Sequence, residues 1–327
     1  MLPNIDTIVQ LIRSHGEFVL TTHVNPDGDG LGSELALART LEKMGKHVTI
    51  LNHSETPDNY KFLDKNRKII RFVPEAHTTI LQQAEVIFVV DTNQPNRLRS
   101  MEPFVLQSMA VKVVIDHHLD ASDFAQHYLI DENATSTGEI IFRLLTALDG
   151  KPFEKEIADA LYTAIMTDTG SFRYPRTDPE THTIVATLLQ CGTDPTEIYS
   201  NVYENWTPGR LRLLGEALDS LKTEYGGKLA IMICTRKMFQ QTGTSEVETD
   251  NFTTYPMSVQ GVLVGILINE LENGVKISFR SKGEIPINEL AKEFEGGGHK
   301  NAAGARLHDV SLTDAIKSVI ERAEKYL

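Results

Sequence analysis

Short runs of β-branched and apolar residues alternate with helix-like spacing of apolar residues between Phe18 and about Gln190. The runs FVLTTH, VIFVVD and VKVVIDHH have the length of buried strands, and they are separated by segments in which apolar residues recur every three or four positions. Leu37, Leu41 and Met44 are an example of the second pattern. Because strands that alternate with helices build parallel sheets with crossover connections, we predict an α/β domain with a parallel sheet here.

The C-terminal third of the chain shows a different pattern. It contains the apolar runs KLAIMIC, VLVGILINE and VKISFRS, and Glu272-Asn273-Gly274 between the last two favours a hairpin turn. Two helices are expected to follow, one opening at Pro286 and one from about Leu312. The predicted division is a first domain, a linker and a smaller α/β domain, at residues 1–190, 191–210 and 211–327.

Composition and charge narrow the classes of function. A hydrophobic content of 41% with 24% charged residues in 327 positions is typical of a globular protein and not of a disordered or fibrous chain. The net charge of −13 argues against a broad, salt-driven surface for long nucleic acid, although it does not exclude short oligonucleotides. Cys191 and Cys234 are expected to be unpaired thiols.

The N-terminal segment lacks the basic region and the uninterrupted apolar core of a signal peptide. The longest apolar run, GVLVGILI, is too short to span a bilayer. We therefore expect a cytoplasmic protein without a membrane partner.

Carboxylates and imidazoles gather where the predicted strands end. In parallel α/β sheets ligands bind at the carboxyl ends of the strands, so separate segments can deliver side chains to one point. A donor set of carboxylates and imidazoles without thiolates suits Mn²⁺ or another borderline-hard divalent ion, and the pattern predicts a two-metal site. The candidate segments are His23-Val24-Asn25-Pro26-Asp27-Gly28-Asp29, Asp91, Asp116-His117-His118 and Asp168.

Each candidate also has a simpler interpretation. The start of the first segment matches an EF-hand calcium loop, but its twelfth position is Ala36 instead of a bidentate glutamate, and a strand precedes it. Asp91 and Asp168 would each suit a turn that follows a strand or a helix. Residues 116–118 are consecutive and point in different directions, so one histidine can bind metal while the other faces the substrate.

The segments HVNPDGDGLGS, VVDTNQP, DHH and TDTGSFRY, in this order, closely resemble the four motifs of the DHH phosphoesterase superfamily. The segment GGGHKNAAGA, preceded by ISFRSK, looks like the associated nucleotide-binding domain of the RecJ-like branch. Together these segments span nearly the whole chain. A chain of this length with only these two domains is most similar to the stand-alone nanoRNase (oligoribonuclease) and adenosine-bisphosphate phosphatase group.

The resemblance implies roles for individual residues. Two Mn²⁺ ions are implied, with Mg²⁺ or Co²⁺ as possible substitutes, and Asp91 would bridge them. Asp116 would orient a histidine through a hydrogen bond, and His118 would face the scissile phosphate as transition-state stabiliser or proton donor. The implied ligands are His23, Asp27 and Asp91 for one ion and Asp29, Asp91, His117 and Asp168 for the other.

The second domain would grip the nucleotide. Gly296-Gly297-Gly298-His299 offers backbone N–H groups and an imidazole for an anion, although a glycine run can also be a flexible hinge. The resemblance implies that Arg280 and Ser281 supply a fork donor and a hydroxyl for a second phosphate. Glu295 stands where the family commonly has a fourth glycine, which leaves the fine substrate preference open.

The implied function is a Mn²⁺-dependent phosphoesterase, a monomer or a homodimer. It would cleave short RNA oligonucleotides to mononucleotides and dephosphorylate adenosine 3′,5′-bisphosphate to AMP. Alternative substrates are linear pApA, cyclic di-AMP, pyrophosphate and longer single-stranded DNA. The last is disfavoured by an aromatic content of 7%, because single-strand binding relies on aromatic platforms. A nucleotide-sensing protein without turnover is the non-enzymatic alternative.

Overall fold

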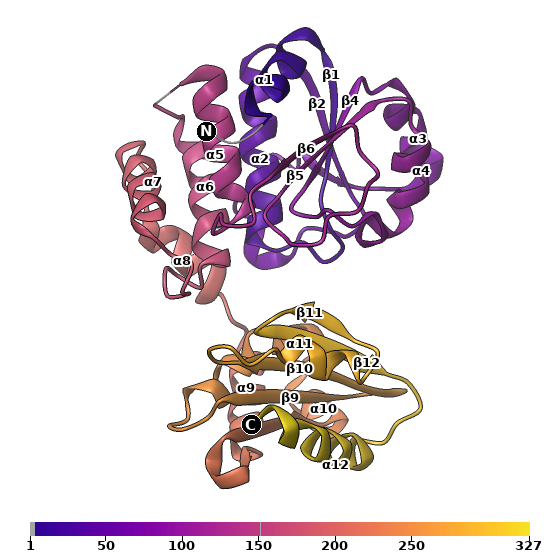
Figure 1. Cartoon of the computed structure of the whole chain (residues 1–327), viewed down its shortest axis with the longest axis vertical. Coiled ribbons are helices and arrows are strands. Elements are labelled where there is room, and N and C mark those ends of the chain that lie inside the picture. Colours follow the sequence, from indigo (N-terminus) through magenta and orange to yellow (C-terminus); the bar gives the residue numbers. More distant parts are fainter. Residues whose placement is uncertain (1–3, 151) are drawn as a thin grey trace. The chain divides into compact units, whose positions relative to one another are not determined.

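The computed structural model describes residues 4–150 and 152–327, without the side chains of Asp149 and His299. The chain separates into two compact units, Met1–Asn205 and Trp206–Leu327 (Figure 1). The boundary lies inside the 191–210 segment that was predicted as a linker. Nearly half of that segment is helix α8 (Pro195–Tyr203), whose Ile198 and Val202 are buried in the core of the first unit.

The first unit contains the predicted parallel sheet. All neighbouring strands run parallel, in the order β3-β2-β1-β4-β5-β6. This arrangement confirms the α/β prediction and brings the carboxyl ends of β1, β4 and β5 together at one edge. The strands are β1 (Glu17–Thr21), β2 (His47–Asn52), β3 (Ile69–Arg71), β4 (Val86–Val90), β5 (Val111–Asp116) and β6 (His127–Ile130).

Helices cover both faces of this sheet (Figure 1). Phe18 and Leu20 of β1 share a buried cluster with α1, α2, α5 and α6. Val19 packs on the other face with α3, α4 and η2, where η marks a 3₁₀ helix. This alternation follows from the two-residue period of a strand. The helices are α1 (Ile5–Ser14), α2 (Gly28–Lys43), η1 (Asp58–Tyr60), α3 (Pro74–Gln83), η2 (Pro95–Met101), α4 (Glu102–Gln107), α5 (Thr137–Asp149), α6 (Lys155–Asp168) and α7 (Pro179–Gln190).

The second unit has its own sheet, in the order β11-β12-β10-β9-β8-β7. Neighbouring strands are antiparallel except β8 and β9, which run parallel. The three predicted strands and the hairpin turn after Leu271 are confirmed. The strands are β7 (Lys222–Glu224), β8 (Leu229–Cys234), β9 (Val264–Leu271), β10 (Gly274–Ser281), β11 (Gly297–His299) and β12 (Ala302–Leu307).

The two helices predicted near the C-terminus begin where the sequence places them, at Ile287 after Pro286 and at Leu312. Helices α9 and α10 pack on the opposite face with Met232 and Leu267. The helices are α9 (Pro208–Asp219), η3 (Tyr225–Gly227), α10 (Arg236–Thr242), η4 (Glu246–Thr249), η5 (Phe252–Thr254), η6 (Pro256–Ser258), α11 (Ile287–Lys292), α12 (Leu312–Ala323) and η7 (Glu324–Tyr326).

Glycines bring α2 close to its neighbours in the first unit. A Cβ atom at Gly32 would overlap the carbonyl oxygen of Ala160 in α6, and one at Gly138 of α5 would lie 2.5 Å from the Cβ atom of Ala164. Side chains at these positions would therefore force the helices apart. The close packing places the N-terminal ends of α2 and α5 beside the C-terminal end of α6.

Two further predictions concern cysteines and membranes. Cys191 and Cys234 are both free, as expected. Among the described residues, none of the helices combines the length and the apolar character needed to cross a bilayer.

Candidate metal centre

The six predicted metal ligands meet in the first unit. The first strand of the sheet leads to His23, and the neighbouring strands β4 and β5 lead to Asp91 and His117. Helix α2 contributes Asp29 from its first turn, and Asp27 caps the same helix. Asp168 is the last residue of α6. Three overlapping sets of side chains, drawn from these residues and from Asp116 and His118, have ligand atoms within 4.8 Å of one another.

His23, Asp27 and Asp91 form the first set. The Nδ1 atom of His23 donates to the carbonyl oxygen of Val24 at 2.9 Å, which directs Nε2 towards the carboxylates. Nε2 lies 3.3 Å from Oδ2 of Asp91 and 3.9 Å from Oδ1 of Asp27. Burial opposes the charged imidazole, but the contact with Asp91 outweighs it and raises the pKa of His23.

Asp27 also starts helix α2. Its Oδ1 atom accepts from the backbone N–H groups of Asp29 at 3.0 Å and Gly30 at 3.2 Å, as an N-cap residue does. The segment therefore turns from strand β1 into a helix and does not form the calcium loop whose first positions it matches.

Asp29, His117 and Asp168 form the second set. Nε2 of His117 lies 3.3 Å from Oδ2 of Asp168 and 3.8 Å from Oδ2 of Asp29. Burial lowers the pKa of His117, which favours the neutral imidazole that metals bind. Its Nδ1 atom lies 3.4 Å from the carbonyl oxygen of Ala134 and can donate to it, which leaves Nε2 free to act as a ligand.

Asp91 belongs to both sides of the centre. One carboxylate oxygen, Oδ2, faces His23, and the other, Oδ1, lies 3.8 Å from Nε2 of His117 and accepts from Oγ1 of Thr137 at 2.9 Å. Burial alone would raise the pKa of Asp91, but His23, His118 and His117 hold this pKa well below its usual range. The carboxylate therefore stays ionised between two groups of ligands, the position that a bridging ligand requires.

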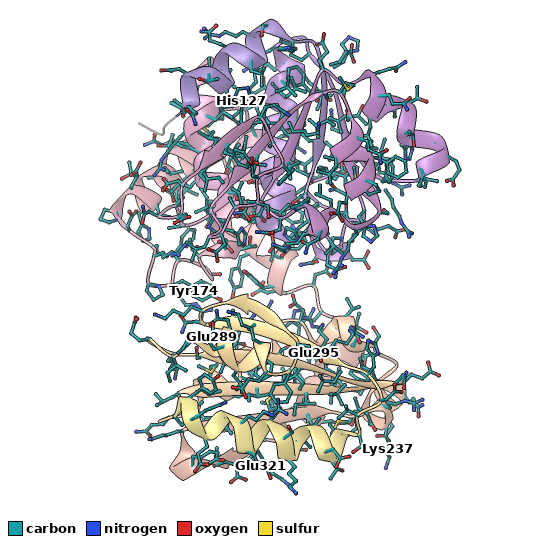
Figure 2. The ribbon with its side chains drawn as sticks, turned by 45° about the vertical axis from the view of Figure 1, so that its right-hand side comes forward. His127, Tyr174, Lys237, Glu289, Glu295 and Glu321 are labelled. Carbon is teal, nitrogen blue, oxygen red and sulfur yellow. The ribbon has the colours of Figure 1, made fainter. Side chains whose placement is uncertain are left out.

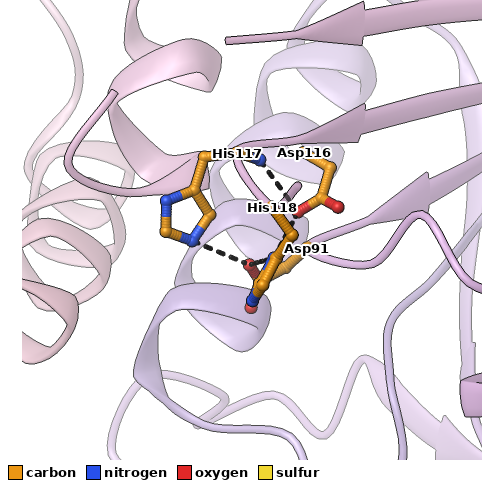
Figure 3. Close-up of side chains that lie close together, drawn as sticks. All are labelled: Asp91, Asp116, His117 and His118. Atoms are coloured by element: carbon orange, nitrogen blue, oxygen red, sulfur yellow. Dashed lines mark hydrogen bonds and ion pairs between the residues drawn. The ribbon is translucent and has the colours of Figure 1, made fainter. Parts of the chain in front are cut away.

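Asp116 and His118 are paired beside these sets (Figure 3). Oδ1 of Asp116 accepts from the backbone N–H of His117 at 2.8 Å and from Nδ1 of His118 at 2.7 Å. Burial lowers the pKa of His118, but this hydrogen bond and the nearby carboxylates raise it in total to about 9. Asp116 therefore fixes the orientation of His118 and favours its protonated form.

The electrostatics of the centre fit divalent cations. Burial, followed by the charges of neighbouring carboxylates, raises the pKa values of Asp29 and Asp168 well above their usual range. The buried Oδ2 atom of Asp116 has no hydrogen-bond partner among the described residues. A buried group of like charges with only imidazoles among it becomes favourable when cations are bound, and oxygen and imidazole donors suit Mn²⁺, Mg²⁺ or Co²⁺.

The N-terminus of α5 also contributes to the centre, and we did not predict this from the sequence. The backbone N–H groups of Thr137 and Gly138 donate to the two oxygens of Asp29 at 2.7 and 2.8 Å. Ser136 caps this helix by accepting from the N–H of Glu139 at 3.1 Å. The segment Ser136-Thr137-Gly138-Glu139 has the spacing of a capping box, so the sequence could have predicted that a helix starts here. It could not have predicted that the N–H groups of this helix start bind Asp29.

In the second unit, Arg280 and Ser281 end strand β10. The hydroxyl of Ser281 donates to the carbonyl oxygen of Ile285 at 2.7 Å and accepts from Nδ2 of Asn301 at 2.9 Å. This hydroxyl proton is thus already used within the protein. Within the described residues, Arg280 donates from Nη1 to the carbonyl oxygen of Phe279 at 3.1 Å and makes no other hydrogen bond, so most of its guanidinium donors are available for a phosphate.

The glycine segment forms strand β11, an edge strand paired with β12 among the described residues. A Cβ atom at Gly298, whose φ is +143°, would lie 2.5 Å from the carbonyl oxygen of Ala302, whereas Gly297 has open space. Glu295, labelled in Figure 2, precedes this strand. Its φ of +57° is a conformation that glycine adopts more easily. The side chain of His299 lies outside the described part of the structure.

Comparisons with known proteins identify two domains. The N-terminal domain of the DHH family matches residues 17–165, and the DHHA1 domain matches residues 226–327. A bifunctional oligoribonuclease and PAP phosphatase NrnA of Thermus thermophilus is 30% identical over 95% of this chain and 90% of its own length. A cyclic-di-AMP phosphodiesterase PdeA of Listeria monocytogenes is 26% identical over 97% of this chain, which spans 49% of that protein.

Solved structures share this architecture. The crystal structure of an exopolyphosphatase-related protein from Bacteroides fragilis is 32% identical, with a TM-score of 0.95 over 99% of this chain and 96% of the other. RecJ of Thermus thermophilus in complex with Mn²⁺ is 16% identical, with a TM-score of 0.59 over 99% of this chain and 55% of RecJ. At that identity the likeness to RecJ concerns the fold alone.

Proposed function

Since this chain belongs to the DHH family of phosphoesterases and is therefore a hydrolytic enzyme, we propose a specific reaction for it. The reaction is the hydrolysis of short RNA oligonucleotides to mononucleotides, together with removal of the 3′-phosphate from adenosine 3′,5′-bisphosphate. The observation that carries this proposal is the convergence of carboxylates and imidazoles at the ends of β1, β4 and β5 and at α2 and α6. The name of the Thermus thermophilus relative supports both substrates.

The two sets of side chains are proposed to hold one divalent cation each, with Asp91 between them. Mn²⁺ is proposed because its intermediate hardness suits a mixed oxygen and imidazole site. Bound divalent ions would polarise the phosphate and lower the pKa of a water molecule. The proposed ligands are His23, Asp27 and Asp91 for one ion and Asp29, Asp91, His117 and Asp168 for the other.

The chain's own residues prepare the reaction. Thr137 and Gly138 hold the carboxylate of Asp29 in place, so it does not rotate when a substrate approaches. Asp116 holds Nδ1 of His118, so Nε2 is the ring nitrogen that can turn towards a substrate. We propose that its N–H group stabilises charge on the scissile phosphate or protonates the leaving oxygen, a role for a positioned histidine in general acid catalysis.

In the second unit, Arg280 and the edge strand that includes Gly297, Gly298 and His299 are proposed to bind a further phosphate of the substrate. The free donors of Arg280 support this role. Ser281 is proposed to support the site indirectly, because its hydroxyl connects Ile285 with Asn301. A cytoplasmic location and a monomeric or dimeric state remain predictions from the sequence.

The test compares substrates under identical conditions. Adenosine 3′,5′-bisphosphate, 5′-pApA and a long RNA are incubated with Mn²⁺, with Asp91→Ala as the blank. Turnover of the two small substrates in preference to the long strand is expected. Preference for the long strand, or no turnover of any of the three, would overturn the proposal.

Cyclic di-AMP is the second candidate substrate, because the relative from Listeria monocytogenes carries that activity in its name. This chain spans only about half of that protein, so the relation supports a shared chemistry of hydrolysis more than a shared substrate. Including cyclic di-AMP and linear pApA in the same series distinguishes the two candidates. Faster turnover of the cyclic form would favour the second.

A further inference from the structure

We propose that four basic side chains beside the metal centre form a phosphate-binding row for the RNA strand beyond the scissile bond. The basic row consists of His53, Arg71, Arg97 and Arg99 in the first unit. Its occupant is the phosphodiester backbone of a single-stranded oligonucleotide. This inference rests on the proposed function and adds where, on the catalytic unit, the rest of the substrate lies.

The sheet order places the basic row next to the candidate metal centre. Strands β3 and β2 lie beside β1, on the side away from β4. Arg71 is the last residue of β3 and pairs in register with Asn52, the last residue of β2, which His53 follows. Along one edge of the sheet, the strand ends therefore change from basic at β3 and β2 to metal-binding at β1, β4 and β5.

Helix η2 brings the other two arginines to the same edge. The backbone N–H of Val24, next to His23, donates to the carbonyl oxygen of Arg97 at 2.9 Å. The hydroxyl of Ser100 lies 2.7 Å from Nδ1 of His53. Helix η2 is thus tied to the end of β1 at Arg97 and to the end of β2 at Ser100, with Arg99 between these two attachment points.

The donors of the basic row are available. Arg97 is half-buried and Arg99 is exposed, and neither guanidinium has a hydrogen bond or ion pair with another residue in the described ranges. The backbone N–H of Ser100 donates to Nδ1 of His53 at 3.4 Å, so a neutral His53 carries its proton on Nε2 and can donate it.

Charge effects on neighbouring groups agree with this placement. Burial and then the charges of Arg71 and Arg99 lower the pKa of His53. The arginines therefore concentrate positive potential at this edge in a chain whose net charge is −13.

Among the described residues, Glu55 is the acidic side chain that contacts the row. Glu55 lies 3.3 Å from Arg71, and the two side chains are 77% and 62% exposed. An ion pair this exposed contributes little free energy and is readily exchanged for a phosphate. Glu55 therefore does not block the row.

The dimensions select an oligonucleotide over a mononucleotide. Neighbouring strands lie about 4.8 Å apart, so the ends of β1 and β3 are separated by about 10 Å. When one phosphate of a strand lies at the metal centre, Arg71 and Arg99 are placed to bind further phosphates of the same strand. These contacts are electrostatic, which predicts binding without base preference and with a strong dependence on salt.

The test measures the salt dependence of binding with the full chain. Fluorescein-labelled penta-adenylate is titrated without added metal at several salt concentrations, with unlabelled adenosine 3′,5′-bisphosphate as a competitor in a second series. The test variant is Arg71→Ala/Arg99→Ala. The control is Arg13→Ala/Lys65→Ala, because these exposed cations precede β1 and β3 and so lie towards the other ends of those strands.

Each phosphate that a protein neutralises on a single strand contributes about 0.7 to the slope of log affinity against log salt, so the slope of the test variant is expected to be smaller by about 1.4. With Mn²⁺ present, its kcat/KM for the pentanucleotide should fall at least about fivefold more than its kcat/KM for adenosine 3′,5′-bisphosphate. The control variant should keep the wild-type slope and ratio.

Two results would count against these ideas in different ways. If the wild type binds and cleaves the pentanucleotide while the test variant matches the control in slope and ratio, the basic row is wrong and the proposed function stands. If the wild type neither binds nor cleaves the pentanucleotide, the proposed function fails and the inference fails with it.

Discussion

Asp91 is the side chain on which the candidate metal centre depends most. It is 2% exposed and has a φ of +60°, a left-handed conformation that Asp and Asn tolerate better than most residues. Held this way at the end of β4, it directs Oδ2 to His23 and Oδ1 to His117. The backbone conformation thus lets one carboxylate serve both sets of ligands.

Asp91→Asn is expected to abolish metal-supported hydrolysis, with a loss of about a thousandfold or more, because it removes the bridging charge without changing the backbone preference. His118→Ala should slow hydrolysis but keep the metal bound, since His118 is paired with Asp116. Calorimetric titration with Mn²⁺ and initial rates separate these effects. Exposed Asp123→Asn is the matched control, and full activity in Asp91→Asn would refute the bridging role.

Glu34 of α2 is a second informative side chain. It is fully buried, and its Oε2 atom accepts from Nδ2 of Asn52 at 2.8 Å, while Oδ1 of Asn52 accepts from the backbone N–H of Thr22 at 3.1 Å. Burial, followed by the charges of Asp91 and Asp64 and partly opposed by the hydrogen bond from Asn52, raises the pKa of Glu34 to about 8. The folded protein therefore binds a proton that the unfolded chain releases above its ordinary pKa of 4.5.

This raised pKa predicts how stability depends on pH. The folded state binds more protons than the unfolded state between about pH 4.5 and 8, so Glu34 lowers stability as the pH rises through that window. Glu34→Gln keeps the hydrogen bond to Asn52 without a titrating group, and should raise the Tm relative to wild type at about pH 9 by at least about 2 °C more than at about pH 5. Scanning calorimetry with exposed Glu75→Gln as control checks this, and equal shifts at both pH values would contradict it.

The contact between helices α2 and α6 helps to set the geometry of the candidate centre. Helix α2 carries Asp29, and α6 ends at Asp168, so the separation of the two helices sets the separation of these carboxylates. Gly32 permits this approach because a Cβ atom there would overlap the carbonyl oxygen of Ala160. The geometry of these candidate ligands is therefore a consequence of helix packing.

Gly32→Ala is expected to destabilise the protein by about 1–3 kcal/mol and to weaken Mn²⁺ binding, because the helices must separate. Gly215→Ala, at an exposed position of α9 with open space around the glycine, should instead stabilise by about 0.5–1 kcal/mol. Urea unfolding of both variants gives the comparison. Equal effects of the two substitutions would show that a side chain at position 32 fits between α2 and α6.

For the molecule as a whole, the carboxylates of the centre oppose folding when no cation is bound. Asp29 and Asp168 both have raised pKa values because they are buried and lie near other carboxylates. A ligand that binds only the folded state stabilises it in proportion to the logarithm of its concentration. Divalent cations should therefore stabilise the folded chain as well as support its chemistry.

After treatment with EDTA, addition of Mn²⁺ at 100 times its Kd is expected to stabilise the protein by about 2.7 kcal/mol. A fluorescence melting series over Mn²⁺ concentration measures the effect, and Asp91→Asn serves as the variant in which it should nearly vanish. A Tm that does not respond to Mn²⁺, Mg²⁺ or Co²⁺ in the wild type would argue against a metal centre in the first unit.

The parts of the fold and site that could be predicted depend on neighbouring residues. The parallel sheet followed from apolar runs that alternate with helical spacing, and the hairpin after Leu271 followed from its turn residues. The candidate ligands were visible because each one follows a strand or a helix whose pattern is local. Helix α8 was not predicted, because Cys191-Gly192-Thr193-Asp194-Pro195 interrupts the preceding pattern and was interpreted as the start of a linker.

Other features depend on contacts between distant segments, which no local pattern encodes. The positive φ of Asp91, the N–H groups that Thr137 and Gly138 offer to Asp29, and the internal hydrogen bonds of Ser281 arise only once the strands and helices have packed. The sheet order β3-β2-β1-β4-β5 likewise places the basic row beside the candidate metal centre. The motifs thus specify which ligand types are present, and packing specifies which atoms they face, because spatial neighbours are set by the sheet order and by the approach of α2 to α6.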